Sequence, residues 1–414
     1  MKFFKQFDNG LRLIINRVDG LFSVTSGVLV KTGSVNESEE ENGISHFIEH
    51  VLFKGTKKRT AFEISDHIDR IGAQINAFTS KEMTCYYTKS TGEHVEDSLE
   101  ILSDIFFDSV FDKNELEKEK GVIIEEIKMS EDTPEDLCLD LLASGYYGKE
   151  GFGRPILGSA SNIKKFNIDY INAYMDKYYT ADNVVISLAG NVDIDKTVEL
   201  VNRYFAERFT RFKSAKQVKT TTAKPQNLYK SKRIEQSHIA FAMKGFKAND
   251  PMSDAFAIAN TVLGGGMSSR LFQKIREELG LCYSVYSYPS QYKDNGVLEI
   301  YAGVNTSARE LAVDAIVSEV ERFKKDGITE SEFSRGKEQL KSSFIMGRES
   351  TASQMLLYGK YLLFLDKEFD FNERIKKLES VTIDDVHKAI ATSFDIRNSA
   401  TATVGSKRSP IRIK

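Results

Sequence analysis

The chain has 414 residues, of which 41% are hydrophobic and 28% are charged. This is enough apolar material for more than one hydrophobic core, so we expect two or more domains. The formal net charge of -3 argues against a nucleic-acid partner, because surfaces that bind polyanions are usually strongly basic.

The cysteines and the N-terminus indicate the compartment. The chain has an odd number of cysteines, and they lie far apart in sequence: Cys85, Cys138 and Cys282. Neither a disulfide framework nor a thiolate zinc site is therefore indicated. The first ten residues lack the apolar stretch and small-residue cleavage site of a secretory signal. No apolar run approaches the roughly 20 residues that span a bilayer. We therefore expect a cytoplasmic protein with no membrane partner.

A polar, lysine-rich stretch divides the chain into two similar lengths. Residues 212–232 contain Thr220, Thr221, Thr222 and Pro225 and show little apolar periodicity, which is typical of a linker. The predicted domains are therefore residues 1–211 and residues 233–414.

The first half alternates between the two periodicities of regular structure. β-branched runs predict strands, and 3.6-residue apolar patterns predict helices. In chain order we expect strands at 11–18 and 24–32, a helix containing His46 and His50, a helix at 62–71, a strand pair within 73–89, and long helices over about 93–129 and from about 135.

The second half repeats this order of elements. We expect a strand at 239–243, helices at 253–263 and 269–279, and a strand at 282–288. Residues 271–280 align with residues 63–72, and a glycine closes each helix. The predicted fold class is α+β, with two homologous halves that each form a mainly antiparallel sheet with helices packed on one face.

The segment His46-Phe47-Ile48-Glu49-His50 carries the chemistry. Positions four apart lie on one face of a helix, so His46 and His50 can present two imidazole nitrogens to one metal ion. Glu49 would lie beside that ion, where it can act as general base toward a metal-activated water. Two histidines on a half-apolar helix are ordinarily structural, but with 6 histidines in the chain the complete five-residue pattern rarely arises by chance.

A catalytic zinc ion needs a third protein ligand, and the acidic helix 112–132 is the obvious source. Glu119 and Glu126 are two helical turns apart and share a face, and Glu115 can lie on the same side. Spacing alone does not choose among these three, because most glutamates on so charged a helix are solvated.

Three segments of the chain resemble the pitrilysin-type inverzincin peptidases, in the branch that includes the mitochondrial processing peptidase beta subunit and its bacterial relatives. These segments are residues 43–56, residues 119–127 and residues 264–272. The resemblance covers nearly the whole chain. It implies that Glu126 is the third metal ligand and that Glu119 supports the site from behind the ligands.

The resemblance also implies a substrate-binding surface. The family uses an Arg and a Tyr seven residues apart, matched here by Arg276 and Tyr283, to bind the substrate backbone and help to stabilise the oxyanion. The segment Asn76, Ala77, Phe78 and Thr79 resembles the edge strand that pairs with an extended peptide.

The second half lacks a metal motif of its own. The helix at 255–260 has no histidine, and Ser343 stands opposite Glu126 in the repeat. The glycines at 264–266 lack the Lys-Ser or Lys-Thr of a nucleotide loop. The isolated histidines are interpreted as surface or packing residues; these are His67, His94, His238 and His387.

Together these patterns predict a zinc-dependent endopeptidase that cleaves peptides or unfolded polypeptide segments with one Zn²⁺ per chain. Relatives of this length commonly pair, so we expect a homodimer or a heterodimer. One alternative is a non-catalytic peptide-binding or structural subunit of the same family. Another is a metal hydrolase that acts on other amides or esters.

Overall fold

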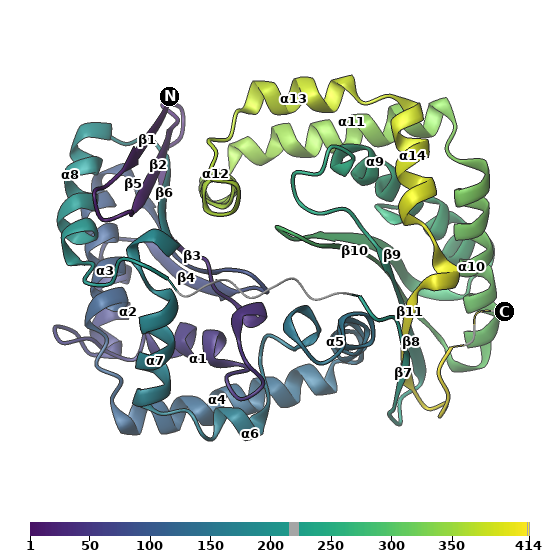
Figure 1. Ribbon diagram of the computed structural model, residues 1–414, viewed down its shortest axis with the longest axis horizontal. Coiled ribbons are helices and arrows are strands. Elements are labelled where there is room, and N and C mark those ends of the chain that lie inside the picture. Colours follow the sequence, from purple (N-terminus) through teal and green to yellow (C-terminus); the bar gives the residue numbers. More distant parts are fainter. Residues whose placement is uncertain (215–222, 412, 414) are drawn as a thin grey trace. The chain divides into compact units, whose positions relative to one another are not determined.

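The protein is described from a computed structural model that covers residues 1–214, 223–411 and 413. The chain folds into two compact units, each built from separate stretches of sequence (Figure 1). The first unit comprises Met1–Ile127, Pro155–Val218 and Ile345–Phe369, and the second comprises Lys128–Arg154, Lys219–Phe344 and Asp370–Lys414. Each unit has its own hydrophobic core.

The first unit is organised around a six-stranded sheet with the order β1-β2-β6-β3-β5-β4. Neighbouring strands are antiparallel except for the parallel pair β2 and β6. The strands are β1 (Lys2–Gln6), β2 (Arg12–Arg17), β3 (Ser23–Val30), β4 (Gln74–Thr79), β5 (Thr84–Thr91) and β6 (Val184–Gly190).

One face of this sheet forms the core with the helices of the same unit. In β3, Val24, Val28 and Val30 are almost fully buried in this core, as the two-residue period of a strand requires. The helices assigned to this unit are α1 (Ile44–Val51), α2 (Ala61–Arg70), α3 (Val95–Asp108), α4 (Lys113–Asp132, of which the last five residues belong to the second unit), α6 (Ala160–Ile163), α7 (Ile168–Tyr178) and α8 (Ile194–Tyr204).

A helix from the far end of the chain, α12 (Thr351–Leu365), covers the other face of the sheet. The intervening residues of β3 point toward it: the hydroxyls of Thr25 and Thr351 are 2.8 Å apart. A Cβ added at Gly27 would lie 2.4 Å from Sδ of Met355, so the helix approaches the strand backbone closely. The central strands β2, β3 and β6 are therefore covered on both faces, whereas the edge strands β1 and β4 are partly exposed.

The second unit contains a five-stranded sheet with the order β7-β11-β8-β10-β9. Its strands are antiparallel except for the pair β7 and β11. The strands are β7 (Asn227–Ser231), β8 (Gln236–Lys244), β9 (Cys282–Gln291), β10 (Gly296–Asn305) and β11 (Ala400–Gly405). The helices are α5 (Pro134–Tyr147), α9 (Ser253–Gly264), a π-helix (Phe272–Glu278), α10 (Arg309–Asp326), α11 (Glu330–Met346), α13 (Phe371–Ser380) and α14 (Ile383–Ser393).

The predicted duplication is visible in the topology. The strand order β2-β6-β3-β5-β4 of the first sheet corresponds one by one to β7-β11-β8-β10-β9 of the second, and β1 is an addition at one edge. Gly72 and Gly280, the predicted helix-closing glycines, have φ of 62° and 61°. The predicted α+β class with two homologous halves is confirmed, but the predicted packing of helices on one face is wrong for the first sheet, because α12 covers its other face.

Several predicted boundaries differ from the structure. The long helix expected at 93–129 is two helices, α3 and α4, separated at residues 109–112. In the predicted linker, residues 215–222 lie outside the described residues, and residues 227–231 form the strand β7 rather than linker.

The compact units differ from the predicted contiguous domains in the place of two helices. Helix α5, expected in the first domain, belongs to the second unit, and α12, expected in the second domain, belongs to the first unit. Helix α5 packs against β8 and β11 of the second unit, whereas α12 packs against β3 and β6 of the first. Within the part of the chain that the structure describes, no helix is both long enough and apolar enough to cross a membrane.

Candidate metal centre

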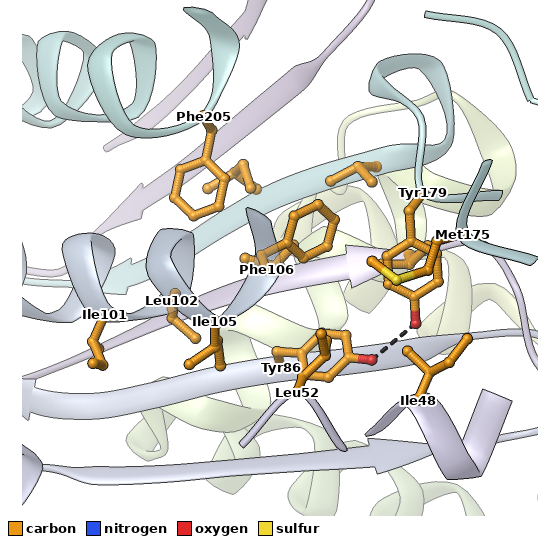
Figure 2. Packing of buried hydrophobic residues seen from close by; sticks show 14 of the residues in the cluster. Ile48, Leu52, Tyr86, Ile101, Leu102, Ile105, Phe106, Met175, Tyr179 and Phe205 are labelled. Atoms are coloured by element: carbon orange, nitrogen blue, oxygen red, sulfur yellow. Dashed lines mark hydrogen bonds between the residues drawn. The ribbon is translucent and has the colours of Figure 1, made fainter. Parts of the chain in front are cut away.

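Helix α1 owes its position to its apolar face. Ile44, Phe47, Ile48 and Val51 follow the helical period and are at most 1% exposed. Figure 2 shows Ile48 and Leu52 within the core, where the hydroxyls of Tyr86 and Tyr179 are 2.9 Å apart. Burial of this face leaves His46, Glu49 and His50 on the other side of the helix.

A buried carboxylate, Glu37, holds the start of α1. Its Oε2 accepts hydrogen bonds from the backbone N–H of Gly43 at 2.8 Å and from the side-chain amide of Asn42 at 2.9 Å. Its Oε1 accepts from the backbone N–H of Ser45 at 2.9 Å. A carboxylate suits this place because the N–H groups at a helix N-terminus lack partners within the helix and carry partial positive charge.

The structure brings His46, His50 and Glu126 together. The two Nε2 atoms are 3.2 Å apart, and Oε2 of Glu126 lies 3.7 Å from His46 Nε2 and 3.5 Å from His50 Nε2. Among the described residues this is the one group of three or more potential metal ligands whose donor atoms all lie within 4.8 Å of one another.

These separations fit a zinc ion. Bonds of about 2.0–2.1 Å at tetrahedral angles place neighbouring ligand atoms roughly 3.3 Å apart, close to the three distances observed. Two imidazoles and one carboxylate also match a known ligand set of catalytic zinc sites, which keep a fourth position open.

The two histidines differ in their affinity for protons. Burial, together with the neighbouring His50, lowers the pKa of His46 to about 4, so this ring is neutral at neutral pH. Burial opposes the charge on His50, but the hydrogen bond that His50 donates to Glu119 and the charges of Glu126, Glu119 and Glu49 outweigh it and raise the pKa of His50.

Glu119 fixes the orientation of His50. Its Oε1 lies 2.8 Å from Nδ1 of His50, and its Oε2 lies 2.8 Å from Nζ of Lys54. When Nδ1 donates its proton to Glu119, Nε2 of His50 keeps its lone pair for a metal. Burial acts to raise the pKa of Glu119, but its bonds with His50 and Lys54 lower it overall.

Glu49 is tied to the edge strand β4. The Oγ1 of Thr79, the last residue of β4, donates a hydrogen bond of 2.6 Å to Oε2 of Glu49. Burial raises the pKa of Glu49, and the Thr79 hydrogen bond partly counteracts this. A carboxylate with a raised pKa is a better base, which is the property a proton shuttle needs.

Strand β4 also contains Asn76, Ala77 and Phe78. It pairs with β5 and is the last strand in the sheet order, as the predicted peptide-pairing edge requires. The contact from Thr79 to Glu49 adds a role that the sequence did not indicate. Substrate pairing by this strand stays a prediction.

Arg276 and Tyr283 belong to the second unit. Arg276 lies in the π-helix, with its guanidinium 4.7 Å from the ring centre of Phe272 and 5.0 Å from that of Tyr283. Tyr283, on the edge strand β9, is 78% exposed. The two predicted residues therefore form one stack, and their action on a substrate stays a prediction.

Other candidates fall outside the centre. Glu115 pairs with Lys118 at 2.6 Å, so the choice among three glutamates on α4 reduces to Glu119 behind His50 and Glu126 beside both histidines. Sequence reasoning missed Glu37 and Lys54. The available signal for Lys54 was its place four residues after His50, one helical turn further along the chain.

Comparison with models of protein families shows to which family the chain belongs. Residues 19–160 match the family model "Insulinase (Peptidase family M16)", and residues 165–340 match "Peptidase M16 inactive domain". The chain belongs to peptidase family M16. The resemblance to pitrilysin-type peptidases is thereby confirmed.

Relatives cover nearly the full length of this M16 chain. YmxG of Bacillus subtilis strain 168, named an uncharacterized zinc protease, is 44% identical over 383 residues, which is 92% of each chain. A crystal structure titled peptidase M16 inactive domain from Pseudomonas fluorescens has a TM-score of 0.92 at 18% identity and covers all of both chains.

A chain of complex III2 from Candida albicans has a TM-score of 0.82 at 18% identity and covers 98% of this chain and 96% of that chain. At this level of identity the two structural matches show a shared fold.

The contacts of Glu37 predict that its two carboxyl oxygens stabilise the start of α1 as hydrogen-bond acceptors, although burial raises the pKa of this group and so disfavours its charge. Replacement of Glu37 with Gln keeps one acceptor oxygen but places an NH2 group where the other oxygen was, so at least one N–H group loses its acceptor and the free energy of unfolding should fall by about 1–3 kcal/mol. Urea denaturation followed by circular dichroism measures this change. The control is Glu40→Gln, an exposed position three residues later. Equal stability of the two variants would show that the carboxylate is dispensable.

The raised pKa of His50 predicts that zinc binding depends on pH. A protonated imidazole cannot ligate a metal, and His46, with a pKa of about 4, is already neutral near pH 6. Below the pKa of His50, binding must displace one proton, so zinc affinity should fall about tenfold per pH unit. Competition with a chelating dye between pH 5 and 8 measures the slope. A flat profile between pH 6 and 7 contradicts the assignment of His50.

Proposed function

We propose that this protein is a zinc-dependent endopeptidase that cleaves peptides or unfolded polypeptide segments. The observation that carries the proposal is the convergence of His46, His50 and Glu126 beside Glu49. His46, His50 and Glu126 would hold one Zn²⁺ per chain. When bound, zinc polarises a water molecule and the substrate carbonyl, which lowers the barrier to hydrolysis.

Four residues of the chain would transfer the proton or position the groups around the metal. Glu49 would take the proton of the attacking water and pass it to the leaving amine, and Thr79 would hold its carboxylate in place. Glu119 would keep His50 in the tautomer that exposes Nε2, and Lys54 would balance the charge of Glu119.

The substrate would be held by main-chain contacts. β4 is the last strand of its sheet among the described residues, and its outer edge would offer backbone groups of Asn76, Ala77 and Phe78 to an extended peptide. Arg276 and Tyr283 would bind the substrate backbone and stabilise the developing oxyanion. The stack of Arg276 between two aromatic rings supports this role because it limits the motion of the guanidinium.

We also propose a cytoplasmic location and a dimeric state, as a homodimer or a heterodimer. The free thiols of Cys85, Cys138 and Cys282 support a reducing compartment. Light scattering on the purified chain measures its mass in solution. A mass of two chains indicates the homodimer, and a mass of one chain leaves the heterodimer with a second protein.

Replacement of Glu49 with Gln tests the peptidase. The variant should keep stoichiometric zinc by metal analysis but lose roughly two to four orders of magnitude in kcat/KM on a quenched fluorescent peptide, because the proton acceptor is gone. Glu115→Gln, an isosteric change outside the centre, should leave both quantities unchanged. Full activity of the Glu49 variant would refute the mechanism. Stoichiometric zinc without turnover of any peptide by the native chain would favour the non-catalytic alternative.

Replacement of Thr79 with Val tests the hydrogen bond to Glu49. We expect kcat to fall roughly tenfold, as is usual when a residue that orients a metal-site group is lost. The Thr79 bond lowers the pKa of Glu49, so its loss should raise that pKa. A base is inactive once protonated, so the acid limb of the kcat profile should move to higher pH.

Thr91→Val, at the exposed end of β5, is the matched control for this substitution. A loss of activity in the Thr79 variant without movement of the acid limb would indicate a structural effect on β4 alone.

A further inference from the structure

The first unit contains a cavity of about 610 Å³, a size typical of small-ligand sites. It is formed by the end of α3, the following residues 109–111, helix α7 and residues 208–211. As far as the structure describes the chain, its lining includes none of the proposed metal ligands. The peptidase proposal therefore does not account for it.

The floor of the cavity is apolar and aromatic. Phe106, Met175, Tyr179 and Phe209 line it and are at most 8% exposed. Figure 2 shows Phe106, Met175 and Tyr179 side by side in the core. Such a floor can receive the hydrocarbon part of a ligand.

The mouth of the cavity remains partly apolar. Val110 and Ile168 also belong to the lining and are each 42% exposed. Their neighbour Phe111 has φ of 52°, a left-handed conformation that bulky residues rarely adopt. Residues in such conformations cluster at functional sites, including those that clamp ligands.

Three cations and one carboxylate complete the lining: Lys57, Arg208, Arg211 and Asp108. Asp108 is shared by two of the cations, at 2.6 Å from Arg208 and 3.6 Å from Lys57. Arg211 pairs with Asp176, which lies outside the lining. Even with Asp176 counted, one positive charge remains in excess, which suits a ligand with a single negative charge.

We propose that this cavity binds an apolar carboxylate, with its hydrocarbon part on the aromatic floor and its charge beside Lys57 and Arg211. The single excess charge favours a monocarboxylate over a phosphate, which carries more negative charge than the lining can balance. Lys57 has a side chain that is 72% exposed and lies 3.6 Å from Asp108. Asp108 would keep its 2.6 Å pair with Arg208 if Lys57 turned toward the ligand.

Calorimetric titration of the purified full-length chain with octanoate tests the proposal, with octan-1-ol and octyltrimethylammonium as neutral and cationic probes of equal chain length. Octanoate should bind at one saturable site about tenfold more tightly than octan-1-ol, because only octanoate forms charge-assisted contacts. Equal affinity for all three probes would overturn the proposal that the cavity recognises a negative charge.

A blocking variant separates the cavity from the metal centre, which could also bind a carboxylate. Asn172 lies exposed on α7 within the lining, so Asn172→Trp should fill the mouth and weaken octanoate at least tenfold. Ala173→Trp, at the next exposed position of α7 and outside the lining, should bind as the native chain does. Native affinity in the Asn172 variant would overturn the proposal.

The double variant Lys57→Gln and Arg211→Gln tests the cations directly. It should weaken octanoate about tenfold and leave octan-1-ol unchanged. These readouts are independent of peptidase activity, so a failure here and a failure of the proposed function can be told apart. Unchanged octanoate affinity in the double variant would show that Lys57 and Arg211 do not bind the carboxylate, and would refute the proposal.

Discussion

Burial of the apolar face of α1 is the constraint on which the candidate metal centre depends. Ile44, Phe47, Ile48 and Val51 enter the core of the first unit, and each such side chain contributes about 1.5–3 kcal/mol of hydrophobic stabilisation. Because helical geometry fixes the angle between positions, this burial also fixes the direction of His46 and His50. The same side chains that stabilise the unit therefore orient the ligands.

Local patterns predicted much of the fold, and the misses have a physical cause. The helix of the metal motif and the strand pair 73–89 follow clear periodicities, and the structure contains both. β6 and β11 were missed because each is buried along its whole length, which removes the alternation that marks a strand. The exchange of α5 and α12 depends on contacts between residues that are far apart in sequence, which no local pattern records.

The candidate site, like the fold, was predicted in part from local sequence patterns. Spacing identified His46 and His50, but the choice of Glu126 needed the family resemblance. Glu37 and Lys54 went unnoticed because charged residues in polar stretches are usually solvated. Only the folded chain shows that Glu37 is 3% exposed and meets the N-terminus of α1.

The duplication shows how the candidate metal centre of the first unit differs from the equivalent positions of the second. The alignment that pairs residues 63–72 with 271–280 places Ile258 opposite His50 and Val262 opposite Lys54, and the alignment of the acidic helix places Gly336 opposite Glu119. A Cβ added at Gly336 would lie 3.2 Å from Val262 and 3.3 Å from Ile258. The same three positions therefore meet in both units.

In the first unit these positions form the ionic chain His50, Glu119 and Lys54, whereas in the second they form an apolar contact. An isolated buried carboxylate is costly without a partner, so replacement of the histidine and the lysine by apolar residues would also remove the reason to keep the glutamate. The second unit keeps the contact between the two helices but has none of the three ionic side chains at these positions. This supports the interpretation of Glu119 and Lys54 as parts of the candidate metal centre rather than as general supports of the fold.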